Sequence, residues 1–177
     1  MPVAISSQKV GSLGGGLPPE DREALLGVSS GYQRMHGSLM WGGPMYSPRA
    51  GSFTRLRGNS DGRLYVSENV GGVAYGGNDP HLYIPRGGLW LLGVTQAWES
   101  DTGARGAGLG QSMSYGDQSM LIWSDIGLGR FVMATRLVWL PTGTRLYPWV
   151  WATETNSRMS PTDRGISSTY SATYIGG

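Results

Sequence analysis

The stretch RFVMATRLVWLPTGTRLYPWVWATE, which runs from Arg130 to Glu154, holds three of the seven tryptophans of this 177-residue chain. Successive side chains of a β-strand point to opposite faces of its sheet. In the first half of the stretch this alternation assigns one face to Phe131, Met133, Thr135, Leu137 and Trp139 and the other face to Val132, Ala134, Arg136, Val138 and Leu140. Both faces are largely apolar, which predicts a strand that is covered on both sides.

A turn and a second strand complete the stretch. In LPTG, Pro141 suits the second position of a type I turn and Gly143 suits the fourth. The chain then reverses into TRLYPWVWATE, so we predict a hairpin in which Tyr147, Trp149 and Trp151 share one face. A two-layer sandwich buries only one face of each sheet. Because three exposed aromatic rings would form a larger apolar patch than a soluble monomer usually carries, we expect a second copy of the chain to cover them.

From Ser52 onward the chain has the pattern of short strands separated by turns. The clearest of these strands is GLWLLGVTQAWES, in which Trp90, Leu92 and Val94 share one face, and the last is SSTYSATYIGG. We interpret DTGARGAGLG, which contains four glycines, as a loop. At least six strands with almost no helix predict an all-β fold, built as an antiparallel sandwich or barrel.

The first 50 residues have a different pattern. LPPEDREALLGV predicts one short helix, because it has prolines and acids at its start and Gly27 near its end. The following SSGYQRMHGSLMWGGPMYSPRAGS has neither helical nor strand periodicity, and we interpret it as an irregular segment that makes contacts. We therefore divide the chain into a docking arm, residues 1–50, and a head domain, residues 51–177. The arm residues expected to make contacts are Leu17, Leu25, Leu26, Met40 and Trp41.

The composition favours a protein that works in an assembly. Glycine accounts for 30 residues, cysteine is absent, and charged residues make up 15% of the chain, compared with about 25% in a typical soluble domain. The absence of cysteine excludes thiolate metal sites, redox pairs and a cysteine nucleophile. Low charge together with many tryptophans, tyrosines and methionines predicts that partners cover much of the surface.

Charge and hydropathy argue against nucleic acid and membranes as partners. The net charge is only +2, and the arginines are scattered, with Arg55, Arg57 and Arg63 as the densest group. Nucleic-acid binders usually gather such charge on one face. No apolar run approaches the ~20 residues of a membrane helix, and Met1–Lys9 lacks the basic start and apolar core of a signal peptide. We expect a soluble protein made in a cytoplasm.

The order of the segments resembles the jelly-roll family of tumour necrosis factor and the complement heads. Domains of that family show a G-x-Y strand, a long strand that turns before G-D-x-V, and a terminal S-x-F-S-G-x-hydrophobic motif. Gly88-Leu89-Trp90 resembles the first, Leu137–Leu146 the second and Ser168–Ile175 the third. The chain departs from the pattern at Thr144, where the family has an acid, and at Ala172 in the terminal motif.

This resemblance covers residues 52–177 and implies an antiparallel jelly-roll sandwich that assembles as a compact homotrimer. Aromatic side chains of the inner sheets would meet on the threefold axis, and the implied axis strands include Tyr147–Trp151 and Tyr170–Tyr174. The expected trimer-interface residues are Tyr147, Trp149, Trp151, Tyr170 and Tyr174. Domains of this kind occur as trimeric tips of phage tails and capsid appendages.

No catalytic, cofactor or metal site stands out in the sequence. The chain has two histidines, His36 and His81, and lacks the G-x-S-x-G pattern of a nucleophile elbow. Asp79 and His81 would supply only two of the ligands that a metal site needs. Asp61 in GNSDG resembles part of a calcium loop, but the remaining acids are missing, and a turn explains it better. We therefore expect no cofactor and no enzymatic activity.

Carbohydrate binding is the rival function, because tryptophan and tyrosine present apolar rings with a polar handle. The loops that would carry such a site, DTGARGAGLGQSMSYGD and TETNSRMSPTDRG, contain no tryptophan, which favours assembly. A more distant alternative is an enzyme that acts on glycans, with Asp117 and Asp125 as its carboxylate pair. Nothing in the sequence brings these two acids together.

The sequence thus supports the hypothesis of a phage virion structural protein. A homotrimeric jelly-roll head would be anchored by the N-terminal arm to the major capsid or tail proteins, as a capsid decoration protein or a minor tail protein. The alternative is a receptor- or glycan-binding tip protein of a tail or capsid fibre, with a host surface glycan as its partner. Both readings place the protein in the virion, and the sequence does not distinguish a capsid location from a tail location.

Overall fold

The computed structural model describes residues 35–43, 47–58, 64–99, 103–111, 120–126, 129–154, 157–163 and 165–177. The chain divides into two compact units, Met1–Gln33 and Arg34–Gly177. All of the described residues belong to the second unit, which we call the sandwich domain. The predicted short helix lies outside the described residues, as do Leu17, Leu25 and Leu26 of the predicted docking arm.

Every regular element within the described ranges is a β-strand. The strands are β1 (His36–Trp41), β2 (Thr54–Arg55), β3 (Leu64–Val70), β4 (Ala74–Tyr75), β5 (His81–Tyr83), β6 (Gly88–Trp98), β7 (Arg105–Gly110), β8 (Met120–Ile126), β9 (Phe131–Leu140), β10 (Arg145–Ala152), β11 (Met159–Ser160), β12 (Thr162–Asp163), β13 (Ile166–Ser167) and β14 (Thr169–Gly176).

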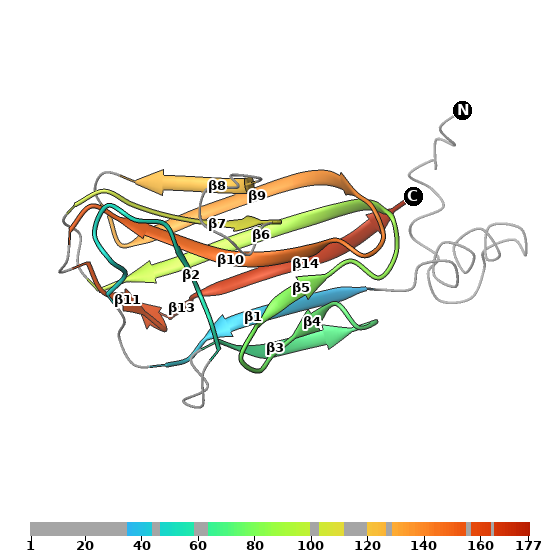
Figure 1. The fold of residues 1–177 in the computed structure, drawn as a ribbon, viewed down its shortest axis with the longest axis horizontal. Helices are drawn as coiled ribbons and strands as arrows, with labels where there is room; N and C mark the ends of the chain where they lie inside the picture. Colours follow the sequence, from blue (N-terminus) through green and yellow to red (C-terminus); the bar gives the residue numbers. More distant parts are fainter. Residues whose placement is uncertain are drawn as a thin grey trace, which may run out of the picture. The chain divides into compact units, whose positions relative to one another are not determined.

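Twelve of the strands form two antiparallel sheets that pack face to face (Figure 1), and β12 and β13 pair with each other in a separate two-stranded sheet. In the β6 sheet the order is β3, β1, β14 and β6, and both β9 and the short β11 also pair with β6. In the β10 sheet the order is β4, β5, β10, β7 and β8, and β2 also pairs with β10. The first and last strands in the sequence of the sandwich domain, β1 and β14, lie side by side. The predicted all-β antiparallel sandwich is confirmed.

The core lies between the sheets and follows the predicted alternation. Trp90, Leu92 and Val94 of β6 are buried, whereas Leu91 between them is 40% exposed on the opposite face. From the β10 sheet, Leu146 and Val150 point into the same core. Burial of apolar surface stabilises the domain by roughly 25 cal/mol per Å², so these inward faces hold the two sheets together.

The glycine-rich segment predicted as a loop contains a strand instead. β7 lies between β8 and β10, and its glycines face the aromatic rings of those neighbours. A Cβ added at Gly106 would overlap the ring of Trp123, and one added at Gly108 would lie 2.7 Å from the same ring. The missing side chains of alternate residues therefore leave room for a neighbour's ring to lie over the strand, which is how aromatic residues stabilise strand glycines.

The predicted hairpin of the opening stretch is wrong, because its two strands belong to different sheets. β9 pairs with β6, whereas β10 pairs with β7, β5 and β2. The connecting turn is also shifted by one residue. The Thr144 amide donates to the Pro141 carbonyl (3.3 Å), and Gly143 has a φ of +88°, which is the third position of a type II turn. The Gly143 amide donates to the Ile84 carbonyl (2.8 Å) and ties the turn to the chain before β6.

The N-terminal boundary of the sandwich lies earlier than residue 50. β1, which falls in the segment predicted to be irregular, is an internal strand between β14 and β3. Trp41 is buried in the core, and Met40 pairs with Thr169 and Tyr65. Met40 and Trp41 therefore belong to the sandwich domain rather than to an arm. A single glycine-flanked strand has too short a run of alternation for its period to be recognised in the sequence.

Candidate functional site

The outward aromatic face of β10 is covered by the same chain. Residues 47–58 cross over β10, where the Leu56 amide donates to the Pro148 carbonyl (2.9 Å). The Arg55 guanidinium lies 5.1 Å from the centroid of the Tyr147 ring, and the ring of Phe53 stacks on Trp151 with centroids 6.3 Å apart. Tyr147 and Trp149 are consequently buried, and Trp151 is half-buried.

The two predicted interface tyrosines of β14 also point into the interior. The Tyr170 hydroxyl donates to Gln96 Oε1 (2.8 Å), and the Gln96 side-chain amide donates in turn to Ser168 Oγ (3.0 Å). Complete burial raises the pKa of Tyr170, because desolvation disfavours the phenolate. Tyr174 packs edge-on against Trp90, with ring centroids 5.3 Å apart. Both tyrosines belong to the hydrophobic core of one chain.

These positions correct the expected interface. Four of the five predicted interface side chains are buried in a single chain, so they leave almost no exposed surface for a second copy. They are Tyr147, Trp149, Tyr170 and Tyr174. The argument that an aromatic face needs a cover holds for β10, but residues 47–58 supply the cover.

Among the described residues, most of the exposed large hydrophobic side chains lie on the β6 sheet. Leu91 of β6 and Met133, Leu137 and Trp139 of β9 are exposed by 40%, 54%, 53% and 63%. Leu137 pairs with Leu91 across the two strands, and Trp139 pairs with Leu89, so the side chains form adjoining cross-strand pairs. We call these five residues the apolar face. The alternation of the sequence grouped Met133, Leu137 and Trp139 correctly, but it also predicted that they are covered.

Next to the apolar face, His36 joins three strands of the β6 sheet. Its Nδ1 hydrogen-bonds with Thr173 Oγ1 (2.7 Å), and its Nε2 lies 2.9 Å from Glu68 Oε2. A hydroxyl, a histidine and a carboxylate in this order resemble a catalytic triad. Thr173 pairs with His36 on one side and Leu91 on the other, in the middle of the sheet. The backbone amides next to Thr173 belong to a strand that pairs on both sides, so they hydrogen-bond within the sheet rather than with an oxyanion. The arrangement therefore supports a structural role for the cluster.

The remaining candidates from the sequence have other partners or lie outside the described residues. Asp79 Oδ1 lies 2.9 Å from a nitrogen of Arg55, and His81 Nδ1 hydrogen-bonds with the Asp79 carbonyl (2.8 Å). Asp61 and Asp117 lie outside the described ranges, and Asp125 belongs to β8. Among the described residues no three metal-binding side chains gather in one place.

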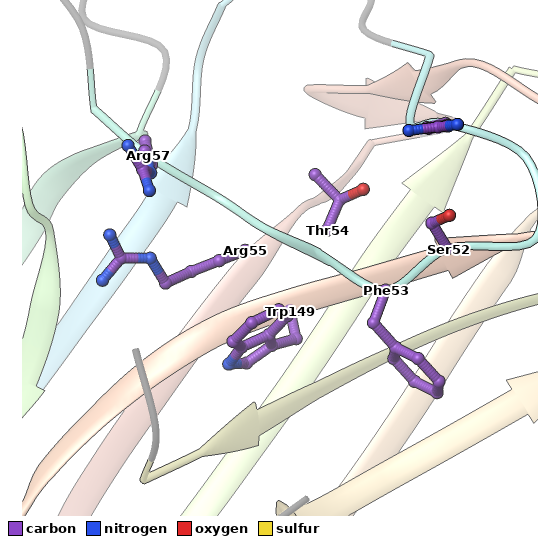
Figure 2. Close-up of a pocket in the computed structure, with 7 residues that line it drawn as sticks. Ser52, Phe53, Thr54, Arg55, Arg57 and Trp149 are labelled. Atoms are coloured by element: carbon purple, nitrogen blue, oxygen red, sulfur yellow. The ribbon is translucent and has the colours of Figure 1, made fainter. Parts of the chain in front are cut away.

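A pocket of about 490 Å³ opens on the outward side of the β10 sheet, beside the segment that covers β10 (Figure 2). Its lining residues are Arg49, Ser52, Phe53, Thr54, Arg55, Arg57 and Trp149. The sequence showed Arg55 and Arg57 as close neighbours but did not show that the fold adds Arg49 and an aromatic floor. Within the part of the chain that the structure describes, no helix has the length and apolar character to cross a membrane.

Comparisons with known proteins identify the fold. No protein-family model matches the chain, and no curated protein sequence matches it. Among solved structures, murine APRIL matches with a TM-score of 0.58 and 11% identity, over 80% of this chain and 99% of that one. The Eiger tumour necrosis factor of S. frugiperda matches with a TM-score of 0.53 and 10% identity, over 82% and 94%.

The vertex protein P5 of PRD1 matches equally well, with a TM-score of 0.57 and 13% identity over 81% of this chain and 98% of that one. At these identities the likeness shows a shared fold. The chain therefore has a jelly roll of the tumour-necrosis-factor type, as its sequence motifs predicted.

Proposed function

We propose that this chain is a structural protein of a phage virion whose sandwich domain assembles as a homotrimer. The observation that carries the proposal is the apolar face of β6 and β9, because an exposed cluster of large apolar side chains is costly to leave in water. The likeness to the vertex protein of the phage PRD1 supports the virion role. The likeness to tumour-necrosis-factor domains supports a trimer.

In this proposal the apolar face replaces the interface expected from the sequence. Leu137 and Trp139 lie on β9, which pairs only with β6 among the described strands, so a neighbouring copy can reach them from the side. Because these side chains are already about half buried, covering Leu137, Met133 and Trp139 would contribute roughly 1 kcal/mol or somewhat more for each. Three such contacts, repeated around a closed ring, favour a permanent assembly over a transient one.

The test of the trimer is the mass of the protein in solution. We expect the wild-type chain to have three times the 19.0 kDa mass of one chain by light scattering. Leu137→Glu should convert it to a monomer, because a charge would be buried at the interface. Tyr75→Glu is the matched control, since Tyr75 is 46% exposed but lies in the β10 sheet. A folded wild-type monomer, or a trimeric Leu137→Glu variant, would refute the proposal.

Docking of the N-terminal unit, Met1–Gln33, to a capsid or tail protein is the second part of the proposal. Leu25→Glu combined with Leu26→Glu in the full chain should abolish binding to virus particles assembled without the protein. The trimer should persist, because the sandwich domain is a separate compact unit. Binding that survives these substitutions, measured by co-sedimentation, would rule out docking through Leu25 and Leu26.

A receptor-binding tip is a second candidate function, and the pocket beside β10 favours it. The pocket and the apolar face lie on different sheets of the sandwich, so one chain can use both.

A further inference from the structure

The pocket beside β10 is held in shape by backbone hydrogen bonds. The segment that forms one side is fixed at both ends to β10, by the Gly51 amide to the Ala152 carbonyl (2.8 Å) and by the Leu56 amide to the Pro148 carbonyl (2.9 Å). Between these bonds, β2 pairs with Trp149 and Val150. A pocket with a fixed backbone loses little entropy when a ligand binds.

Positive charge is concentrated in this pocket. Three of its seven lining residues are arginines, and none of the seven is acidic. Among the described residues, the only carboxylate paired with these arginines is Asp79, which lies 2.9 Å from Arg55. Arg49 and Arg57 have no such partner in the described part of the chain. The pocket therefore keeps an excess of positive charge that favours an anionic ligand.

Arg55 is the lining residue whose side chain is held in place by its neighbours. Its side chain is only 9% exposed, rests on the Tyr147 ring and is oriented by Asp79. Its Nη1 lies 2.9 Å from Asp79 Oδ1, and its Nε is buried without a hydrogen-bond acceptor among the described atoms. A buried donor without an acceptor costs free energy. Arg55 also lines the pocket, and the forked donors of a guanidinium match the geometry of an oxyanion bound there.

The rest of the lining suits a sugar ring. Phe53 is half-buried and provides aromatic surface, only an edge of Trp149 reaches the pocket, and Ser52 and Thr54 provide hydroxyls that both donate and accept hydrogen bonds. Figure 2 shows the segment with Ser52, Phe53 and Thr54 crossing over β10, with Trp149 beneath it. A few polar groups around an aromatic floor are typical of sites for small polar ligands. A nucleic-acid interface would instead need an extended basic stripe.

We propose that this pocket binds an acidic saccharide, with its charged group held by Arg49, Arg55 and Arg57 and its ring beside Phe53. The charged group is a carboxylate, a sulfate or a phosphate. The inference does not rest on the virion role, because all lining residues come from one chain.

Calorimetry and ligand-observed NMR on the full chain test the proposal. The probes are glucuronic acid, glucose 6-sulfate and glucose 6-phosphate, which distinguish the three charged groups, with neutral glucose as the comparison. We expect at least one acidic sugar to bind about tenfold or more tightly than glucose, the ratio that a charge-assisted hydrogen bond provides. If none of the three binds more tightly than glucose, the proposal is overturned.

Variants locate the binding. Arg57→Gln and Arg49→Gln should each weaken the acidic sugar by about tenfold or more, whereas Arg145→Gln should not. Arg145 is an exposed arginine on β10 outside the pocket, so its loss changes the net charge equally. Equal weakening by all three variants would mean general charge attraction and would overturn the site. Inorganic sulfate or phosphate that binds as tightly as the sugars would overturn the saccharide assignment.

A further variant separates this inference from the proposed trimer. Leu137→Glu should keep the affinity for the acidic sugar while it loses the trimer, because Leu137 lies on the other sheet. Loss of sugar binding in a folded Leu137→Glu monomer would refute a pocket formed by one chain.

Discussion

The outward faces of β9 and β10 are similar in sequence, but the face of β9 is exposed and the face of β10 is mostly buried. Each strand presents large apolar side chains away from the core, Met133, Leu137 and Trp139 on β9 and Tyr147 and Trp149 on β10. Trp149 is 4% exposed, whereas Trp139 is 63% exposed. The difference lies in a third segment, residues 47–58, which lies over β10 and not over β9.

The comparison teaches that an aromatic face by itself does not identify an interface. What decides is whether the chain supplies a cover, and here the cover comes from a segment remote in sequence. Phe53 illustrates the point, since it packs against both Trp151 and Trp123, 98 and 70 positions later in the chain. Among the described residues, the face of β9 has no such cover.

The largest expected effect on stability comes from replacing Trp149 by alanine, with the same replacement at Trp139 as the comparison. Trp149→Ala should lower the free energy of unfolding by about 3–5 kcal/mol, because it removes a ring that is only 4% exposed beneath residues 47–58. Trp139→Ala should change it by less than about 0.5 kcal/mol in a monomeric background that carries Leu137→Glu. Urea denaturation of both variants in that background measures the difference. Similar losses for the two variants would show that the face of β9 is also covered within one chain.

Much of the fold could be predicted because strand alternation is a local property. It assigned the two faces of β6 and of β9 correctly, and the jelly roll followed from segment order. Which strands pair is set by contacts far apart in the chain, so the hairpin of β9 and β10 was predicted wrongly. β7 was missed because Gly106, Gly108 and Gly110 carry no side chains to show a period of two.

Substituting glycines should have a smaller effect on stability, and it tests how tightly β7, the strand beside β10, is packed. Gly108→Ala should cost about 1–3 kcal/mol, because its new Cβ would overlap the backbone carbonyl of Ile122, which cannot move away freely. Gly93→Ala on β6 is the matched control. Its Cβ would meet only the hydroxyl of Ser171 at 2.7 Å, and that hydroxyl can rotate. Thermal unfolding of both variants should rank Gly108→Ala clearly lower; equal stability would contradict the close packing of rings over β7.

The candidate sites were harder to predict than the fold. Exposure of Leu137 and burial of Trp149 depend on the cover over each sheet, which alternation does not describe. The arginine pocket needs Arg49 and Arg57 to meet Trp149, and their distance in sequence hides that meeting. The low net charge of +2 and the scattered arginines of the sequence also gave no sign that three arginines line one pocket.

The smallest expected effect sharpens the contrast between the core and the apolar face through pH. Burial raises the pKa of Tyr170 above its ordinary value near 10, so above that pH the unfolded chain releases this proton and the folded chain keeps it. Stability should therefore fall by about 1.4 kcal/mol per pH unit on account of this group.

Tyr170→Phe should remove that dependence between pH 10 and 11, at the cost of about 1 kcal/mol at neutral pH for the lost hydrogen bond to Gln96. Tyr65→Phe is the control, because it removes the hydroxyl of a tyrosine that is 41% exposed on β3. Urea titrations at pH 8, about 10 and about 11 compare the two variants with the parent chain. An unchanged alkaline slope in Tyr170→Phe would mean that this hydroxyl reaches water, and that the aromatic residues of β14 are less enclosed than those of β10.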